Sequence, residues 1–87
     1  PPCARVSWGH HTYRYWEVKN GNVESSHRAA RLSLDRNCSL VITNITAEDA
    51  GRYTCRSGYG SSYVYLRILT SEHLDRVFVV NPVKSRN

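Results

Sequence analysis

The feature that most limits the fold of this chain is a two-residue period in its apolar side chains. The clearest case is residues 63–69, where large polar-tipped or basic side chains alternate with aliphatic ones in the order Tyr63, Val64, Tyr65, Leu66, Arg67, Ile68, Leu69. Successive side chains of a β-strand point to opposite faces, so the pattern predicts a strand with one face toward a core. No stretch has the apolar spacing of a long amphipathic helix. We therefore expect an all-β protein.

The same period returns in short runs along the rest of the chain. We predict further strands in residues 3–8, 13–19, 30–34, 40–46 and 52–57, with a turn-like segment at 47–51 and a glycine and serine loop at 58–62. Asn20-Gly21 predicts a type I′ hairpin turn between 13–19 and a run around Val23, because both central residues of that turn need a positive φ. Short strands with turns about every ten residues indicate a sandwich or a barrel.

Size and charge narrow the class of protein. A chain of 87 residues makes one domain whose core alone gives little stability, and its three cysteines suggest a disulfide and an extracellular location. The net charge of +5 favours anionic partners, but the basic residues are scattered, so we do not expect a nucleic-acid partner. Nothing at the start resembles a signal peptide, and no apolar run approaches the roughly 20 residues of a membrane span.

The most specific pattern lies in residues 31–55, RLSLDRNCSLVITNITAEDAGRYTC. It ends in the signature D-x-G-x-Y-x-C, formed by Asp49, Gly51, Tyr53 and Cys55. With this segment the chain resembles the immunoglobulin superfamily, in particular the variable-type domains of fish immune-type receptors. The resemblance implies a two-sheet Greek-key sandwich that binds partners and has no catalytic or cofactor site.

The resemblance also implies roles for individual residues. Cys3 and Cys55 would form the disulfide between the sheets, and Trp16, 13 positions after Cys3, would pack on it. Tyr53 would hydrogen-bond to upstream backbone, and Gly51 would allow the tight turn before it. Arg31 and Asp49 would form an ion pair at one end of the sandwich.

Cys38 is then the odd cysteine. It would be either a thiol within the domain or a bridge to another chain. Pairing of Cys3 with Cys38 remains an alternative, since three cysteines allow three single bridges.

The two ends of the chain suggest how it could assemble. The immunoglobulin-like part, residues 1–69, begins two residues before the expected strand B cysteine, so the resemblance leaves strand A absent. Residues 70–87 contain a run typical of a strand, which comprises Val77, Phe78, Val79, Val80 and Val83. This donor strand could fold back onto its own domain, complete a neighbouring copy head to tail, or begin a second domain.

Smaller signals concern the surface. Asn44 and Asn37 lie in N-x-S/T sequences that predict glycosylation, Asn44 above all. Tyr59, in the glycine and serine loop, is a candidate binding residue. Adjacent His10 and His11 would face opposite sides of a strand, so we expect no metal site.

The sequence thus supports two functional hypotheses. In the first, the protein is a secreted module whose copies assemble head to tail into a fibre or array through the strand around residues 77–83. In the second, it is the ectodomain of an immune-type receptor that binds an extracellular protein or glycan through its loops around Tyr59. Neither hypothesis includes enzymatic activity, because the chain has none of the motifs that catalysis requires.

Overall fold

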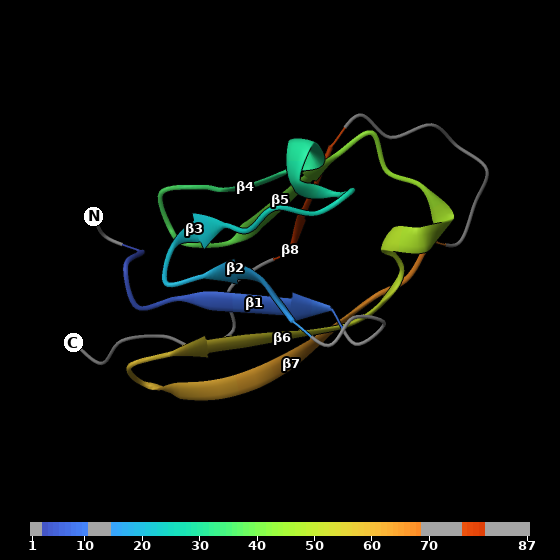
Figure 1. The fold of residues 1–87 in the computed structure, drawn as a ribbon. Coiled ribbons are helices and arrows are strands. Elements are labelled where there is room, and N and C mark those ends of the chain that lie inside the picture. The colour runs from blue at the N-terminus through green and yellow to red at the C-terminus, as the bar shows by residue number, and fades with distance from the viewer. Residues whose placement is uncertain (1–2, 11–14, 69–75, 80–87) are drawn as a thin grey trace.

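The computed structural model describes residues 3–10, 15–68 and 76–79, and this part of the chain is all-β (Figure 1). Two single 3₁₀ turns, η1 at Ala29–Arg31 and η2 at Ala47–Asp49, interrupt the strands. The strands are β1 (Ser7–His10), β2 (Trp16–Lys19), β3 (Asn22–Val23), β4 (Leu32–Leu34), β5 (Leu40–Thr43), β6 (Gly51–Ser57), β7 (Gly60–Leu66) and β8 (Arg76–Val79).

The strands form two antiparallel sheets. The larger has the order β3-β2-β1-β6-β7, and the smaller has the order β4-β5-β8. Neighbouring strands of the larger sheet come from distant parts of the sequence, because β1 pairs with β6 across some 45 residues, from His10↔Tyr53 to Ser7↔Arg56. The prediction of an all-β fold is confirmed for the described residues.

Two hairpins show how local residues set the turns. The β2–β3 turn is the predicted one, with φ of 50° at Asn20 and 84° at Gly21. Gly21 also has no room for a side chain, because a Cβ there would lie 2.6 Å from the Cys3 carbonyl oxygen. The predicted loop at 58–62 was too long, since β6 and β7 pair as far as Ser57↔Gly60 and leave only two residues in the turn.

A β-bulge changes the facing of β2. Trp8 of β1 pairs with Val18, but the next residue of β1, Gly9, pairs with Trp16, so Glu17 is the extra residue. Glu17 and Val18 are both buried, whereas Trp16 is only half-buried. The bulge thus sends a carboxylate toward the interior and leaves Trp16 on the opposite side of the sheet.

The inner faces of the two sheets share one apolar core. Trp8 is fully buried in it, and its indole Nε1 donates a hydrogen bond of 3.0 Å to the Cys38 carbonyl oxygen. The core tryptophan is therefore Trp8, and the prediction of Trp16 was wrong. Both sheets contribute to the core, which consists of Cys3, Val6, Trp8, Val18, Leu32, Cys38, Leu40, Ile42, Tyr53, Cys55 and Val79.

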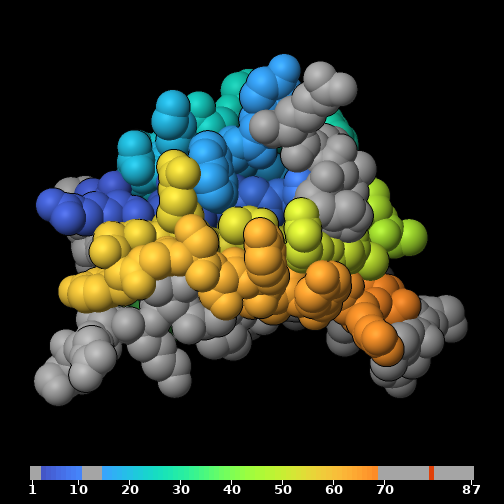
Figure 2. Space-filling model, turned by 90° about the horizontal axis from the view of Figure 1, so that it is seen from below, coloured from blue at the N-terminus to red at the C-terminus, as the bar shows by residue number. Residues whose placement is uncertain are grey.

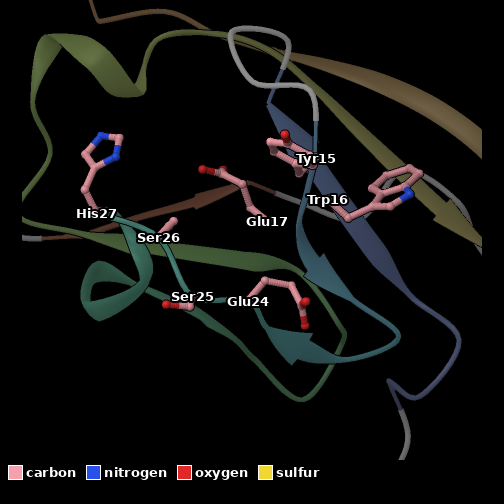
Figure 3. Close-up of a pocket in the computed structure, with 7 residues that line it drawn as sticks. All are labelled: Tyr15, Trp16, Glu17, Glu24, Ser25, Ser26 and His27. Atoms are coloured by element: carbon pink, nitrogen blue, oxygen red, sulfur yellow. The ribbon is translucent and has the colours of Figure 1, made fainter.

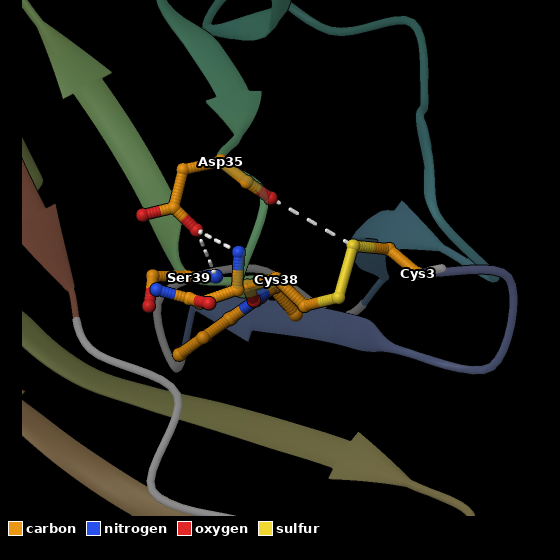
Figure 4. The surroundings of a disulfide bond; sticks show 6 residues. Cys3, Asp35, Cys38 and Ser39 are labelled. Carbon is orange, nitrogen blue, oxygen red and sulfur yellow. Dashed lines mark hydrogen bonds between the residues drawn. A yellow bond between two sulfur atoms is a disulfide. The ribbon is translucent and has the colours of Figure 1, made fainter. Parts of the chain in front are cut away.

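The disulfide also differs from the one that the resemblance implied. Cys3 is bonded to Cys38, with 5.5 Å between their Cα atoms (Figure 4). Cys55 is a buried thiol outside this disulfide. Cys55 lies within β6, opposite Trp8, whereas Cys3 lies in the turn before β1, beside the β4–β5 connection. The alternative pairing is the one present, and Cys38 is not an odd cysteine.

The connection between β4 and β5 explains how Cys38 reaches Cys3. The Oδ1 atom of Asp35 accepts hydrogen bonds of 2.9 Å from the backbone N–H groups of Asn37 and Ser39 (Figure 4). Cys38, between them, has a positive φ of 65°, which is rare for a residue with a Cβ. The aspartate thus holds the backbone in a tight turn with Cys38 directed to the disulfide.

The C-terminal strand lies on the edge of the smaller sheet. β8 pairs antiparallel with β5 from Leu40↔Val79 to Thr43↔Arg76, and Val79 is 3% exposed. Val77 and Phe78 belong to β8, while Val80 and Val83 lie outside the described residues. The predicted strand thus exists at residues 76–79, and its partner is β5 of the same chain.

Candidate functional site

The most unusual interior feature is a fully buried arginine. Arg28 precedes η1, and its side chain is 0% exposed. Its guanidinium lies 2.7 Å from Glu17 Oε1 and 3.0 Å from Asp49 Oδ1. It also donates to the Tyr53 hydroxyl at 2.7 Å and to His10 Nδ1 at 3.0 Å. A buried charge is tolerated only when it is paired and hydrogen-bonded, and this arginine meets both conditions.

Tyr53 connects this network to the backbone. Its hydroxyl donates a hydrogen bond of 2.5 Å to the Asp49 carbonyl oxygen, four residues upstream, which is the contact that the sequence suggested. The His10 ring stacks on the Tyr53 ring with 4.4 Å between centroids. A guanidinium can only donate, so His10 Nδ1 accepts and His10 Nε2 donates to the Ala50 carbonyl oxygen at 2.8 Å.

Asp49 holds a second arginine nearer the surface. Arg31 binds both carboxylate oxygens, at 2.8 and 3.1 Å, so the expected pair of Arg31 and Asp49 is present with two-point geometry. Asp49 Oδ2 also accepts from the Thr46 backbone N–H. Gly51, which follows this turn, has a φ of 125° that favours glycine.

The charges and the burial shift several pKa values. Burial opposes ionisation of Asp49, but the hydrogen bonds from Arg31 and Thr46 and the charge of Arg28 hold its pKa below the ordinary value. Burial dominates at Glu17 and raises its pKa despite Arg28. Burial also raises the pKa of Tyr53 to about 12, although Arg28 acts in the opposite direction. The network is enclosed by its own partners and stabilises the fold.

The opposite face of the larger sheet carries exposed aromatic and basic side chains. Figure 2 shows the side of the molecule on which β7, β6, β1 and β2 are visible together. Tyr63 and Tyr65 of β7 are 58% and 71% exposed, while Val64 between them packs against the core, as the alternation predicts. The guanidinium carbon of Arg52 lies 4.5 Å from the centroid of the Tyr63 ring, and that of Arg56 lies 4.6 Å from the Trp16 ring.

A pocket of about 320 Å³ lies beside this face, at the edge formed by β2 and the segment after β3 (Figure 3). In Figure 3 the Trp16 side chain extends from the start of β2, Tyr15 lies directly before this strand, and the Glu24 side chain comes from the segment opposite. The lining consists of Tyr15, Trp16, Glu17, Glu24, Ser25, Ser26 and His27. Tyr15 is 80% exposed, and the Glu17 carboxylate is already bound by Arg28. The pocket is therefore open to solvent and adjoins the outward face of the larger sheet through Trp16.

The other predicted surface residues are accessible. Tyr59 is 66% exposed in the β6–β7 turn, at one end of β7. Asn37 and Asn44 are both exposed, so the structure leaves room for glycans at either position. Tyr13 and His11 lie outside the described residues.

Sequence reasoning missed two features of the site. Arg28 gives no local signal, since the residues around it, Ser-Ser-His-Arg-Ala-Ala, are typical of an exposed loop. The second is Trp8, whose burial depends on the strand order and on the bulge at Glu17 and has no signal in the local sequence.

The described residues hold no group of three or more histidine, cysteine or carboxylate side chains that could bind a metal ion. None of the helical turns in the described ranges has the length and apolarity to cross a membrane. No protein-family model matches the sequence, and no curated protein or solved structure is significantly similar to it.

Proposed function

We propose that this chain is an extracellular immunoglobulin-like recognition domain that binds another molecule through the exposed aromatic residues of its larger sheet. The strand order supports the immunoglobulin-like part. The larger sheet, β3-β2-β1-β6-β7, follows the order C″C′CFG of variable-type domains, and β4-β5 follows D-E. In this scheme β1 is strand C with its buried Trp8, and β6 is strand F with Tyr53 at its corner.

The scheme also gives β8 a place. Strand B lies next to strand E in an immunoglobulin sandwich, and β8 lies next to β5. The C-terminal strand would therefore stand in for strand B rather than for strand A. The B–F disulfide cannot form with this strand, because Arg76–Val79 contains no cysteine.

The proposed location rests on the disulfide. A bond between Cys3 and Cys38 in a chain of 87 residues suits secretion or the cell surface, since cytosolic thiols are kept reduced. This bond ties the turn before β1 to the β4–β5 connection and so fastens one sheet to the other.

One observation carries the recognition function: four large aromatic side chains, Tyr15, Tyr59, Tyr63 and Tyr65, are 58–80% exposed on one sheet and its turn. Folded proteins expose few such residues without a reason, and tyrosine provides a large contact area at low entropic cost. Recognition through this surface needs no catalytic group.

The test uses the chain as a multivalent probe. Tetramers of the chain are applied to a panel of displayed extracellular proteins, beside tetramers of a Tyr59→Ala, Tyr63→Ala, Tyr65→Ala triple variant. We expect at least one partner that binds the unmodified chain and does not bind the triple variant. The variant should still fold, because these exposed rings make no core contact. Equal binding of both tetramers to every partner found would contradict the proposed function.

A second function, head-to-tail assembly, is favoured by the position of β8. The strand lies at the edge of β4-β5-β8, and exchange of β8 between copies would repeat the same pairing from one copy to the next, forming a filament where the rotation between copies does not close a ring. Sedimentation at increasing concentration tests it. Polymers that vanish when the chain is cut after Thr70 would support assembly, and a monomer at every concentration would exclude it.

A further inference from the structure

On the outward face of the larger sheet, aromatic and small residues form a row across four neighbouring strands. Trp16 pairs with Gly9, Gly9 with Thr54, and Thr54 with Tyr63, so these four residues form one row across β2, β1, β6 and β7. With about 4.8 Å between strands, the Trp16 and Tyr63 backbones are about 14 Å apart. Two small residues thus separate two aromatic anchors.

Each anchor is covered by an arginine from the same strand, β6. Arg56 lies over Trp16, and Arg52 lies over Tyr63. The Trp16 ring rests on Gly9, where an added Cβ would lie only 3.3 Å from the ring atom Cε3. The glycine therefore lets the indole approach the sheet closely while the Arg56 guanidinium lies over the ring, so the two groups are already in contact without a partner.

The strands of this face are mainly basic, and Glu24, which lines the adjoining pocket together with Trp16, is an exposed carboxylate at its edge. The sequences of β1, β6 and β7 contain no aspartate or glutamate, and the one carboxylate of β2, Glu17, is turned inward by the bulge and bound to Arg28. The carboxylates that form ion pairs in the described residues, Glu17, Glu48 and Asp49, bind Arg28, Arg31 or His27. The outward face thus presents positive charge and aromatic rings together.

The geometry points to an acidic protein surface as the partner of this face, here called the basic aromatic face and defined by Trp16, Arg52, Arg56, Tyr63 and Tyr65. Tryptophan, tyrosine and arginine are the residues that dominate the binding energy of protein interfaces. Guanidinium groups bind carboxylates in two-point geometry, and complementary charge speeds association. This inference rests on the proposed recognition function and names the chemistry of its partner.

Two other occupants fit the face less well. A second copy of the chain would bring another net charge of +5 against it. A sulfated glycan would satisfy the arginines, but its highly hydrated chain would gain less from the rings. The difference between arginine and ring substitutions therefore separates a protein partner from a polyanion.

The experiment measures binding of three probes by surface plasmon resonance: a random copolymer of glutamate and tyrosine, poly-glutamate, and dextran sulfate. We expect the copolymer to bind most tightly. Arg56→Glu should weaken copolymer binding roughly tenfold or more. Tyr63→Ala should weaken copolymer binding several-fold and leave dextran sulfate unchanged, because only the polypeptide uses the rings.

The matched control is Arg36→Glu, which makes the same charge change at an exposed position of the β4–β5 connection, on the other sheet. Thermal unfolding verifies that each variant folds, and Arg56→Gln with Tyr65→Ala replaces any variant that does not. Equal weakening by Arg36→Glu and Arg56→Glu, or tightest binding of dextran sulfate, would overturn the inference. A partner that depends on Tyr59 while no acidic probe binds would overturn this inference and leave the recognition function standing.

Discussion

The two faces of the larger sheet use the same residue types for opposite purposes. On the inner face, Arg28 and Tyr53 lie together with two carboxylates, and the guanidinium binds Glu17, Asp49 and Tyr53 inside the protein. On the outer face, Arg56 and Trp16 also lie together, but β1 and β6 contain no carboxylate, and Glu17 of β2 is turned inward to Arg28. A buried charge must be paired within the chain because its desolvation is costly, whereas water stabilises an exposed charge, which stays accessible to a binding partner.

Removing the inner arginine should have the largest effect. Arg28→Ala leaves Glu17 and Asp49 buried without their cation, which should lower the free energy of unfolding by about 3–5 kcal/mol. Urea unfolding measures the loss. The control is Arg31→Ala, since the Arg31 side chain is 17% exposed and water can replace part of its contacts. A loss for Arg28→Ala no greater than that for Arg31→Ala would show that the buried network is not what holds the inner face together.

Removal of the disulfide comes next. The double variant Cys3→Ser, Cys38→Ser should lose about 2–4 kcal/mol, because the bond closes a loop across 35 positions in the unfolded chain. Cys55→Ala should keep the bond. Adding a reductant should therefore destabilise Cys55→Ala as much as the unmodified protein and leave the double variant unaffected. A reductant that destabilises the unmodified protein but leaves Cys55→Ala unaffected would instead indicate the pairing of Cys3 with Cys55.

The inner face should also respond to alkaline pH. Burial raises the pKa of the Cys55 thiol from 9.0 to about 11, so the unfolded chain loses this proton at a lower pH than the folded one. The resulting stability is fully present below about pH 9 and is lost as the pH rises to about 11, by about 2–3 kcal/mol. Tyr53, whose pKa is about 12, adds a similar loss at higher pH.

Urea unfolding of Cys55→Ala across the same pH range isolates this contribution. The variant should lose less stability between about pH 9 and 11 than the unmodified protein does. Parallel pH curves for the two proteins would show that the Cys55 thiol is not responsible.

The smallest effect belongs to the outer face. Arg56→Ala removes a contact with the Trp16 ring at an exposed site, which contributes about 0.5–1 kcal/mol. The thermal midpoint should therefore fall by only a few degrees. A loss as large as that of Arg28→Ala would mean that the two faces do not differ in the way described.

The parts of the fold that the sequence predicted depend on neighbouring residues. The alternation in 63–69 predicted that Tyr63 and Tyr65 face outward and Val64 inward, and Asn20-Gly21 predicted the hairpin turn. The Tyr53 hydrogen bond spans only four residues, so it too follows from a local pattern.

The errors concern contacts between distant segments. The order of strands together with the bulge at Glu17 decides that Trp8 faces the core and Trp16 does not. Burial of Arg28 likewise requires Glu17 and Asp49 to converge from β2 and η2.

The sequence by itself determined that this protein is built of β-strands, where the β2–β3 turn lies and which face of β7 is exposed, because these properties arise from residues that are neighbours along the chain. The tertiary structure decided that Cys3 bonds to Cys38, that Trp8 fills the core and that β8 pairs with β5. A disulfide, a core position and a strand partner depend on the distance between segments far apart in the sequence, and only the folded chain sets that distance.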